Sequence, residues 1–117
     1  MRVECGNPTY SGWRYKVARW AGRYSRRQRR VSPTLKITLV WSDPPGPTLQ
    51  NDLDLIVKAA NGQERHGNMG SSAGFDRANN VEQIVWENIP PGAAKVTVRA
   101  FRITQFPQPY AFAWRLS

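Results

Sequence analysis

After Ser32 the chain consists of short segments in which apolar and polar residues alternate, separated by turns rich in proline and glycine. Alternation with a period of two is the pattern of a β-strand with one buried face. Asn61-Gly62 is a strong hairpin signal, and the prolines of residues 43–47 cannot donate hydrogen bonds to a sheet. The expected strands cover residues 35–41, 53–59, 63–66, 81–86, 94–101 and 110–116. We therefore predict an all-β fold over residues 32–117, a jelly-roll sandwich or barrel.

Residues 1–31 differ from the rest in charge. They contain nine Lys or Arg and one Glu, a balance of +8, whereas residues 32–117 contain eight Lys or Arg and seven Asp or Glu, a balance of +1. The net charge of +9 therefore belongs almost entirely to this first segment. We interpret residues 1–31 as a basic, aromatic N-terminal segment set apart from the domain of residues 32–117.

The aromatic residues of this segment fit two conformations. Helical spacings of four, three and four connect Trp13, Val17, Trp20 and Tyr24, whereas Trp13, Tyr15 and Val17 alternate as in a strand. A helix and an extra strand both stay open, and residues 13–24 could either complete the core or dock a second copy of the chain. The arginines that follow are candidates for polyanion binding through phosphate contacts: Arg26, Arg27, Arg29 and Arg30.

Several classes of function lack the residues they need. Cys5 is the only cysteine, so no disulfide forms within the chain and a zinc site is short of ligands. No apolar run approaches the roughly 20 residues that span a bilayer. Residues 1–31 also lack the apolar core of a secretory signal, so the chain either starts downstream of one or is cytoplasmic.

A catalytic centre is not expected either. His66 is the only histidine, and a triad of Ser71, His66 and Asp76 has no support from spacing. We interpret His66 as an exposed or half-buried residue at a strand end. The tryptophans in the alternating segments are expected in the core (Trp41, Trp86 and Trp114), although an exposed aromatic row could instead bind carbohydrate.

The acidic residues suggest a cation site. Asp52 and Asp54 alternate with Leu53 and Leu55, so both carboxylates project from one face of a strand, about 7 Å apart. They would repel each other unless a cation lay between them. Calcium takes six to eight oxygen ligands, and residues 76–82 offer more carboxylate and amide oxygens. The alternative is that these acids are solvated or pair with lysine and arginine.

A set of motifs gives the chain a family resemblance. These are WSDPP at 41–45, NDLDL at 51–55, HGN at 66–68, D-x-x-N-N-V-E at 76–82, the Pro91-Gly92 turn and PQPYAF at 107–112. In order and approximate spacing they resemble the β-barrel domain that follows the catalytic domain of bacterial subtilisin-like serine proteases. The resemblance covers about 85 residues, but residues 1–31 do not match what precedes that domain and no protease domain precedes it here.

This resemblance implies a non-catalytic, secreted jelly-roll module that binds structural calcium and packs on a protease domain or another protein chain. Nucleic-acid or anionic-surface binding through the basic segment is the alternative hypothesis, although nucleic acid is the less expected partner. Asp43 could instead fix the turn before Pro44. Carried over residue by residue, the candidate calcium ligands are Asp43, Asp52, Asp54, Asp76, Asn80 and Glu82.

Overall fold

The computed structural model describes residues 2–20 and 33–117, which form two antiparallel β-sheets and no helix. Each sheet has four strands, in the orders β1-β8-β3-β6 and β2-β7-β4-β5. The strands are β1 (Arg2–Gly6), β2 (Arg14–Trp20), β3 (Leu35–Trp41), β4 (Asp52–Lys58), β5 (Glu64–His66), β6 (Val81–Trp86), β7 (Ala93–Arg102) and β8 (Tyr110–Leu116).

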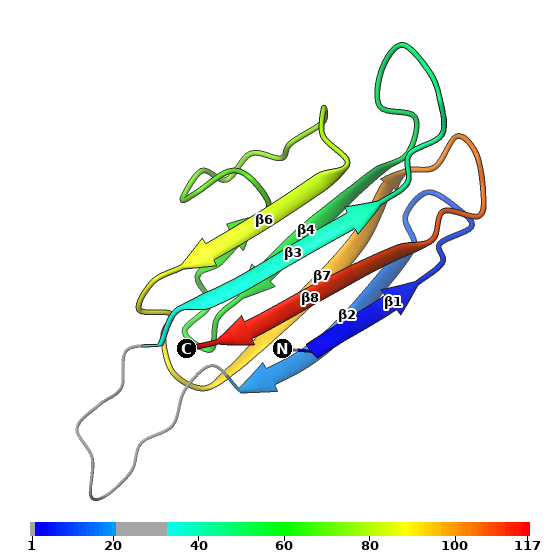
Figure 1. Ribbon diagram of the computed structural model, residues 1–117. Coiled ribbons are helices and arrows are strands. Elements are labelled where there is room, and N and C mark those ends of the chain that lie inside the picture. The colour runs from blue at the N-terminus through cyan, green and yellow to red at the C-terminus, as the bar shows by residue number, and fades with distance from the viewer. Residues whose placement is uncertain (1, 21–32) are drawn as a thin grey trace, which may run out of the picture.

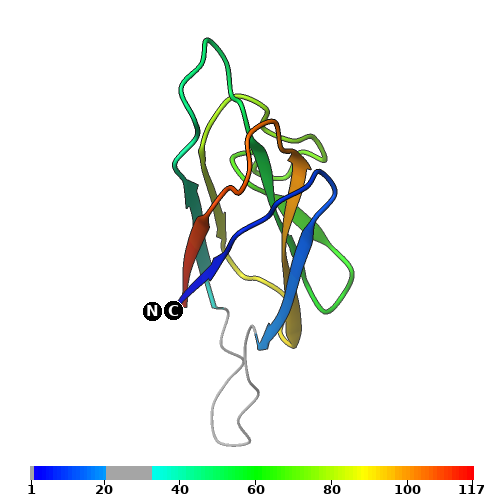
Figure 2. The ribbon, with the colours of Figure 1, turned by 90° about the vertical axis from the view of Figure 1, so that its right-hand side faces the viewer.

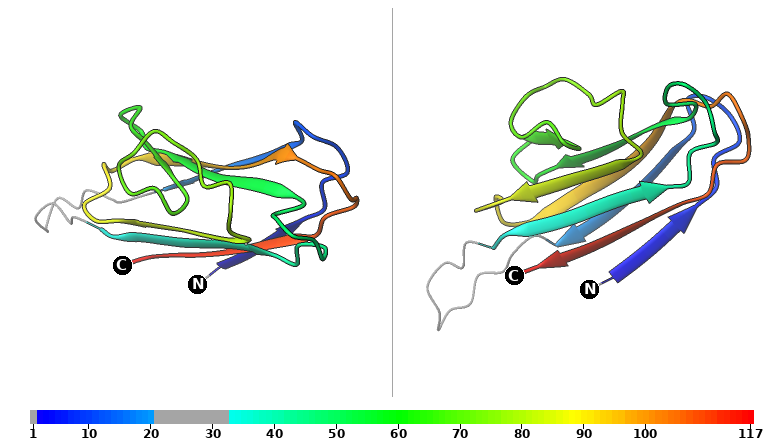
Figure 3. Two further views of the ribbon diagram at one scale, coloured as in Figure 1. Left: turned by 90° about the horizontal axis from the view of Figure 1, so that it is seen from above. Right: turned by 45° about the horizontal axis from the view of Figure 1, so that its top comes forward.

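The topology is that of a jelly roll. The chain crosses between the two sheets at every connection except the hairpin that joins β4 to β5. Figures 1 and 2 show the sheets as two facing layers, and Figure 3 shows the same layers from above. The predicted all-β jelly-roll sandwich is confirmed. The sheets are not closed into a barrel, because β1 pairs only with β8 and β2 only with β7.

The core lies between the layers and follows the predicted alternation. Strand β6 alternates exposed and buried residues along its whole length, and β3 buries every second residue against the facing sheet. Trp41 and Trp86 are buried as predicted, and Trp114 packs partly buried against the same core. Burial of such large apolar side chains is the main favourable term that holds the sheets together.

The N-terminal segment belongs to the sandwich over the residues that the structure describes. Strand β1 pairs with β8 and β2 pairs with β7, so each sheet gains an edge strand from it. Of the two conformations left open for residues 14–20, the strand is the one observed. Trp13 packs edge-on against Tyr110 and Tyr15 lies 6.2 Å from Phe112, so both rings complete the core. Residues 2–20 of the basic segment therefore form two strands of the sandwich, in line with the alternative that the segment supplies an extra strand.

Part of this segment lies outside the residues that the structure describes. Arg26, Arg27, Arg29 and Arg30 lie outside the described residues, and so do residues 21–24 of the predicted docking stripe. Among the residues that are described, no helix is long and apolar enough to cross a membrane.

Candidate metal centre

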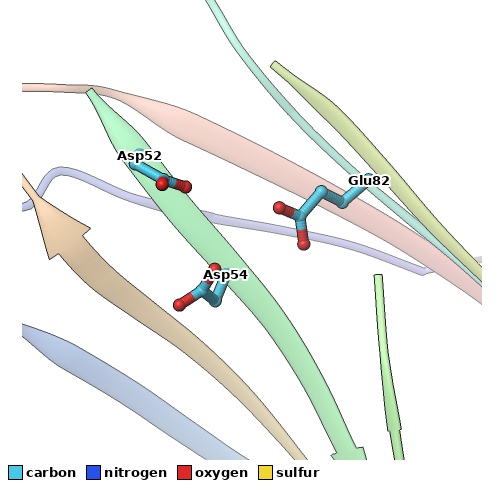
Figure 4. Close-up of side chains that lie close together, drawn as sticks. All are labelled: Asp52, Asp54 and Glu82. Atoms are coloured by element: carbon cyan, nitrogen blue, oxygen red, sulfur yellow. The ribbon is translucent and has the colours of Figure 1, made fainter. Parts of the chain in front are cut away.

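Two carboxylates of β4 lie on the outer side of their sheet. Leu53 and Leu55 point into the core, so Asp52 and Asp54 project from the opposite face, as the alternation predicts. Both side chains are nevertheless buried, with 1% and 0% of their surface exposed. Figure 4 shows them on β4, with Glu82 extending toward them from β6. Oxygens of the three carboxylates lie within 4.8 Å of one another.

Glu82 joins this acidic cluster because the backbone N–H of Leu55, on β4, is not used in pairing with another strand. Strand β5 pairs with β4 only from Ile56 onward, so the N–H of Leu55 has no partner strand on that side. Glu82 Oε1 accepts its hydrogen bond at 3.0 Å. Gly67 permits this approach, since a Cβ there would lie 2.3 Å from Glu82 Oε1. The carboxylate therefore sits where the β5–β6 connection leaves one sheet for the other.

Two arginines supply positive charge to the cluster. Arg77 Nη1 contacts Asp54 Oδ1 and lies 3.3 Å from Asp52 Oδ2, so one guanidinium bridges the two aspartates. Arg99, on β7, donates to Asp54 Oδ2 from Nε at 3.0 Å and from Nη2 at 2.6 Å. Both oxygens of Asp54 are therefore occupied. The cation expected between Asp52 and Asp54 is, in this structure, the side chain of Arg77.

The segment between β5 and β6 covers the outer face of β4 and carries Arg77. Its Phe75 stacks on His66 with a centroid distance of 4.1 Å, and the Gly74 carbonyl lies 2.8 Å from His66 Nδ1. Arg77 also lies over the ring of Phe101, 3.7 Å from its centroid. Figure 3 shows this segment folded over the sheet that contains β4. The aspartates are buried because this segment covers them.

Two oxygens of the cluster have no hydrogen-bond partner among the described residues: Asp52 Oδ1 and Glu82 Oε2. Burial raises the pKa of Asp52 to about 6, opposed by the charge of Arg77 and reinforced by that of Asp54. Burial also raises the pKa of Glu82 to about 9, against the hydrogen bond from the Leu55 N–H. The salt bridges of Arg77 and Arg99 go to the two aspartates, and the charge of Arg102 also acts on Asp52, whereas the neighbouring charges that act on Glu82 are those of Asp54, Asp76 and Asp52. Glu82 is therefore the carboxyl group of the cluster at which a proton or a bound cation is most needed.

The other three predicted ligands make hydrogen bonds outside the group of three carboxylates, although the charge of Asp76 acts on Glu82. Asp43 accepts the N–H groups of Gln50 and Asn51 at 2.8 and 2.7 Å, which closes the proline-rich loop. Asp43 therefore fixes this loop, which is the role that the sequence suggests as the alternative to calcium binding. Asn80 donates from its amide to the carbonyl of Trp41 at 2.8 Å. Neither residue belongs to the group of three carboxylates.

Asp76 organises its own loop. Its carboxylate accepts the N–H of Ala78 at 2.8 Å and the side-chain amides of Asn68 and Asn79 at 2.6 and 2.8 Å. Burial tends to raise the pKa of Asp76, but these hydrogen bonds outweigh it and hold the pKa below its usual range. Asp76 thus positions the residue that follows it, Arg77, and is not itself a member of the cluster.

The remaining chemical candidates contribute no site. His66 is buried, with 8% exposed, rather than exposed or half-buried, and its ring contacts Phe75 and Gly74. The large aromatic side chains that are well exposed among the described residues are Tyr10, Phe101 and Phe106. Tyr10 and Phe106 lie in loops and Phe101 near the end of β7, so they do not form a row along one strand as a sugar platform would.

Sequence reasoning missed Arg77 and Arg99 as members of the site, although pairing of the acids with arginine was an open alternative. The period of two on β7 places Arg99 on the outer face, but only pairing of β7 with β4 brings it to Asp54. No protein-family model matches the chain, and no curated protein matches it either. The fold and the site together define a β-sandwich that contains three buried acidic side chains, with two arginines paired to them.

Proposed function

We propose that this chain is a non-catalytic β-sandwich module that binds one calcium ion at Asp52, Asp54 and Glu82. The observation that carries the proposal is the pair of buried carboxylate oxygens without partners, Asp52 Oδ1 and Glu82 Oε2, inside a cluster 4.8 Å across. A buried charged oxygen with no partner is costly, and a bound cation removes that cost. The donors are all carboxylate oxygens, which suit a hard cation.

Calcium fits this donor set better than magnesium. Calcium accepts six to eight oxygens in flexible geometry, whereas magnesium needs a near-ideal octahedron and keeps several waters. The cluster is buried and irregular, so a complete magnesium hydration shell suits it poorly. The resemblance to the protease C-terminal domain supports the same ion and an accessory, secreted role beside a larger catalytic protein. It also supports a jelly roll, which is the topology found.

The absence of catalysis is part of the proposal. His66 contacts Gly74 and stacks on Phe75, and within residues 2–20 and 33–117 no serine hydroxyl or carboxylate is hydrogen-bonded to its ring. A nucleophile with a base in hydrogen-bond reach is the minimum for acyl transfer. The ring of His66 therefore serves packing of the β5–β6 segment.

Calcium binding is tested by thermal unfolding in chelator and in calcium from 0.01 to 10 mM. A ligand at 100 times its Kd stabilises by about 2.7 kcal/mol, which for a domain of this size raises Tm by roughly 5–15 °C. Asp54→Asn should abolish the shift, because it removes a charged ligand while keeping the side-chain shape. Asp43→Asn is the matched control and should retain it, since Asp43 lies outside the cluster. A wild-type Tm that is constant across the whole calcium range would refute the proposal.

A further inference from the structure

We propose that Arg77 is a tethered counter-ion that competes with calcium for Asp52 and Asp54, so that the ion binds only when Arg77 leaves. This inference rests on the proposed function, and it concerns what sets the affinity of that site. Arg77 contacts one oxygen of each aspartate and comes from a loop, whereas Arg99 comes from the middle of the sheet.

The number of unpartnered oxygens favours the competition. With both arginines in place, each oxygen of Asp54 already accepts a hydrogen bond from a cationic group, and the oxygens without a partner are Asp52 Oδ1 and Glu82 Oε2. Two oxygens fall well short of the six to eight that calcium takes. Departure of Arg77 frees Asp52 Oδ2 and Asp54 Oδ1 as well, which doubles the available carboxylate oxygens to four. Water and backbone carbonyls can then complete the shell.

Arg77 is also the arginine that can move. Its side chain is 35% exposed, against 21% for Arg99, so it already reaches solvent. Its guanidinium lies over Phe101, whose ring is 49% exposed. A cation over an aromatic face is favourable at an exposed site, so Arg77 has a surface position to occupy once the aspartates bind calcium. Arg99 donates two hydrogen bonds that converge on one oxygen of Asp54, and it can stay in place.

In this mechanism the side chain of Arg77 leaves the cluster, and the segment of residues 67–80 that carries it keeps most of its own contacts. Within it, Asp76 binds its own loop through Ala78 and Asn79, so the turn that carries Arg77 is organised independently of the cluster. Phe75 stays stacked on His66 and provides a fixed point beside the site. Calcium binding should therefore loosen the local packing around Arg77 without unfolding the sandwich.

The experiment compares calcium affinity by isothermal titration calorimetry for the wild type, Arg77→Met and Arg115→Met. Arg115 carries the same charge but is exposed on β8, in the other sheet, so it controls for the loss of a positive charge. Arg77→Met should bind calcium about 10- to 100-fold more tightly, the factor expected from removing a hydrogen-bonded, charged competitor. Arg115→Met should bind like the wild type. Hydrogen exchange next to Arg77 should increase on calcium binding in the wild type and in Arg115→Met, but not in Arg77→Met.

The outcomes separate this inference from the proposed function. Wild-type binding with an unchanged or weaker affinity in Arg77→Met overturns the competition but leaves the calcium site standing. Binding by Arg77→Met alone supports the competition and shows that Arg77 excludes calcium from the native protein. No binding by either protein refutes both. Should Arg77→Met fail to fold, Arg77→Lys decides: its ammonium lacks the planar fork of a guanidinium and should hold the two aspartates less well, so at least threefold tighter binding is expected and an unchanged affinity overturns the competition.

Discussion

Glu82→Gln should stabilise the calcium-free protein at neutral pH. Glu82 is 1% exposed, and burial raises its pKa from 4.5 to about 9. Between these two values the folded protein keeps a proton that the unfolded chain releases. The unfolded state then binds fewer protons, so the free energy of unfolding falls as pH rises. The stability associated with protonated Glu82 is complete below pH 4.5 and is lost progressively up to about pH 9.

The size of the expected stability difference follows from the pH interval between the unfolded and folded pKa values of Glu82. At pH 7 the solution is 2.5 units above the unfolded pKa of 4.5, and each unit is worth about 1.4 kcal/mol, so the wild type loses up to about 3 kcal/mol. Glutamine does not ionise, and its carbonyl can still accept the hydrogen bond of the Leu55 N–H. Glu82→Gln should therefore exceed the wild type by up to about 3 kcal/mol at pH 7 and by less than about 1 kcal/mol at pH 5.

The assay is urea unfolding of both proteins in chelator at half-unit steps from pH 5 to 9. Glu87→Gln is the matched control, because Glu87 is exposed just after β6 and lies outside the cluster. The difference in unfolding free energy between Glu82→Gln and wild type should widen with pH, whereas the difference for Glu87→Gln should stay flat. A Glu82→Gln protein that is no more stable than wild type at pH 8 would refute the reasoning.

Two further substitutions test how the site is positioned. Asp43→Ala removes the acceptor of the Gln50 and Asn51 N–H groups and should lower the unfolding free energy by about 1–2 kcal/mol; stability equal to wild type in urea unfolding would contradict this role. Gly67→Ala places a Cβ 2.5 Å from Glu82 Cβ and 2.3 Å from its Oε1, so it should cost about 1–3 kcal/mol by overpacking. In the same assay Gly74→Ala is its control, since that Cβ meets only the flexible end of Met69 at 3.1 Å, and equal losses for both glycines would rule out a specific contact with Glu82.

The strands after Ser32 could be predicted because each carries its own signal. Burial of alternate residues shows directly in the sequences of β3 and β6, and both strands have the predicted bounds. The first two strands lack such a signal. Strand β1 pairs with β8 and β2 with β7, partners about 80 to 110 residues away in the chain. The basic residues around them obscure the pattern, so their place in the sheets depends on pairing that no local window contains.

The residues of the candidate site also differ in how well the sequence predicts their positions. Asp52 and Asp54 were identified because a period of two fixes their common face. Asp43, Asp76 and Asn80 resemble ligands by composition, yet each is a short polar side chain beside a turn and binds nearby or adjacent backbone. Short acidic side chains such as Asp43 and Asp76 compete effectively for local N–H groups. Composition alone therefore does not show which of the candidates gather, and the structure groups Glu82 with Asp52 and Asp54.

Repulsion between Asp52 and Asp54 makes a nearby cation necessary but does not determine its identity. In this structure the chain supplies Arg77 to both aspartates and Arg99 to Asp54. These contacts still leave Asp52 Oδ1 and Glu82 Oε2 without hydrogen-bond partners among the described residues, although the charge of Arg102 also acts on Asp52. Under the proposed function, the remaining charge is met either by a proton on Glu82 or by a small divalent ion that displaces Arg77. Proton and ion thus compete for the same carboxylates, and calcium affinity should rise with pH over the range in which stability of the calcium-free protein falls.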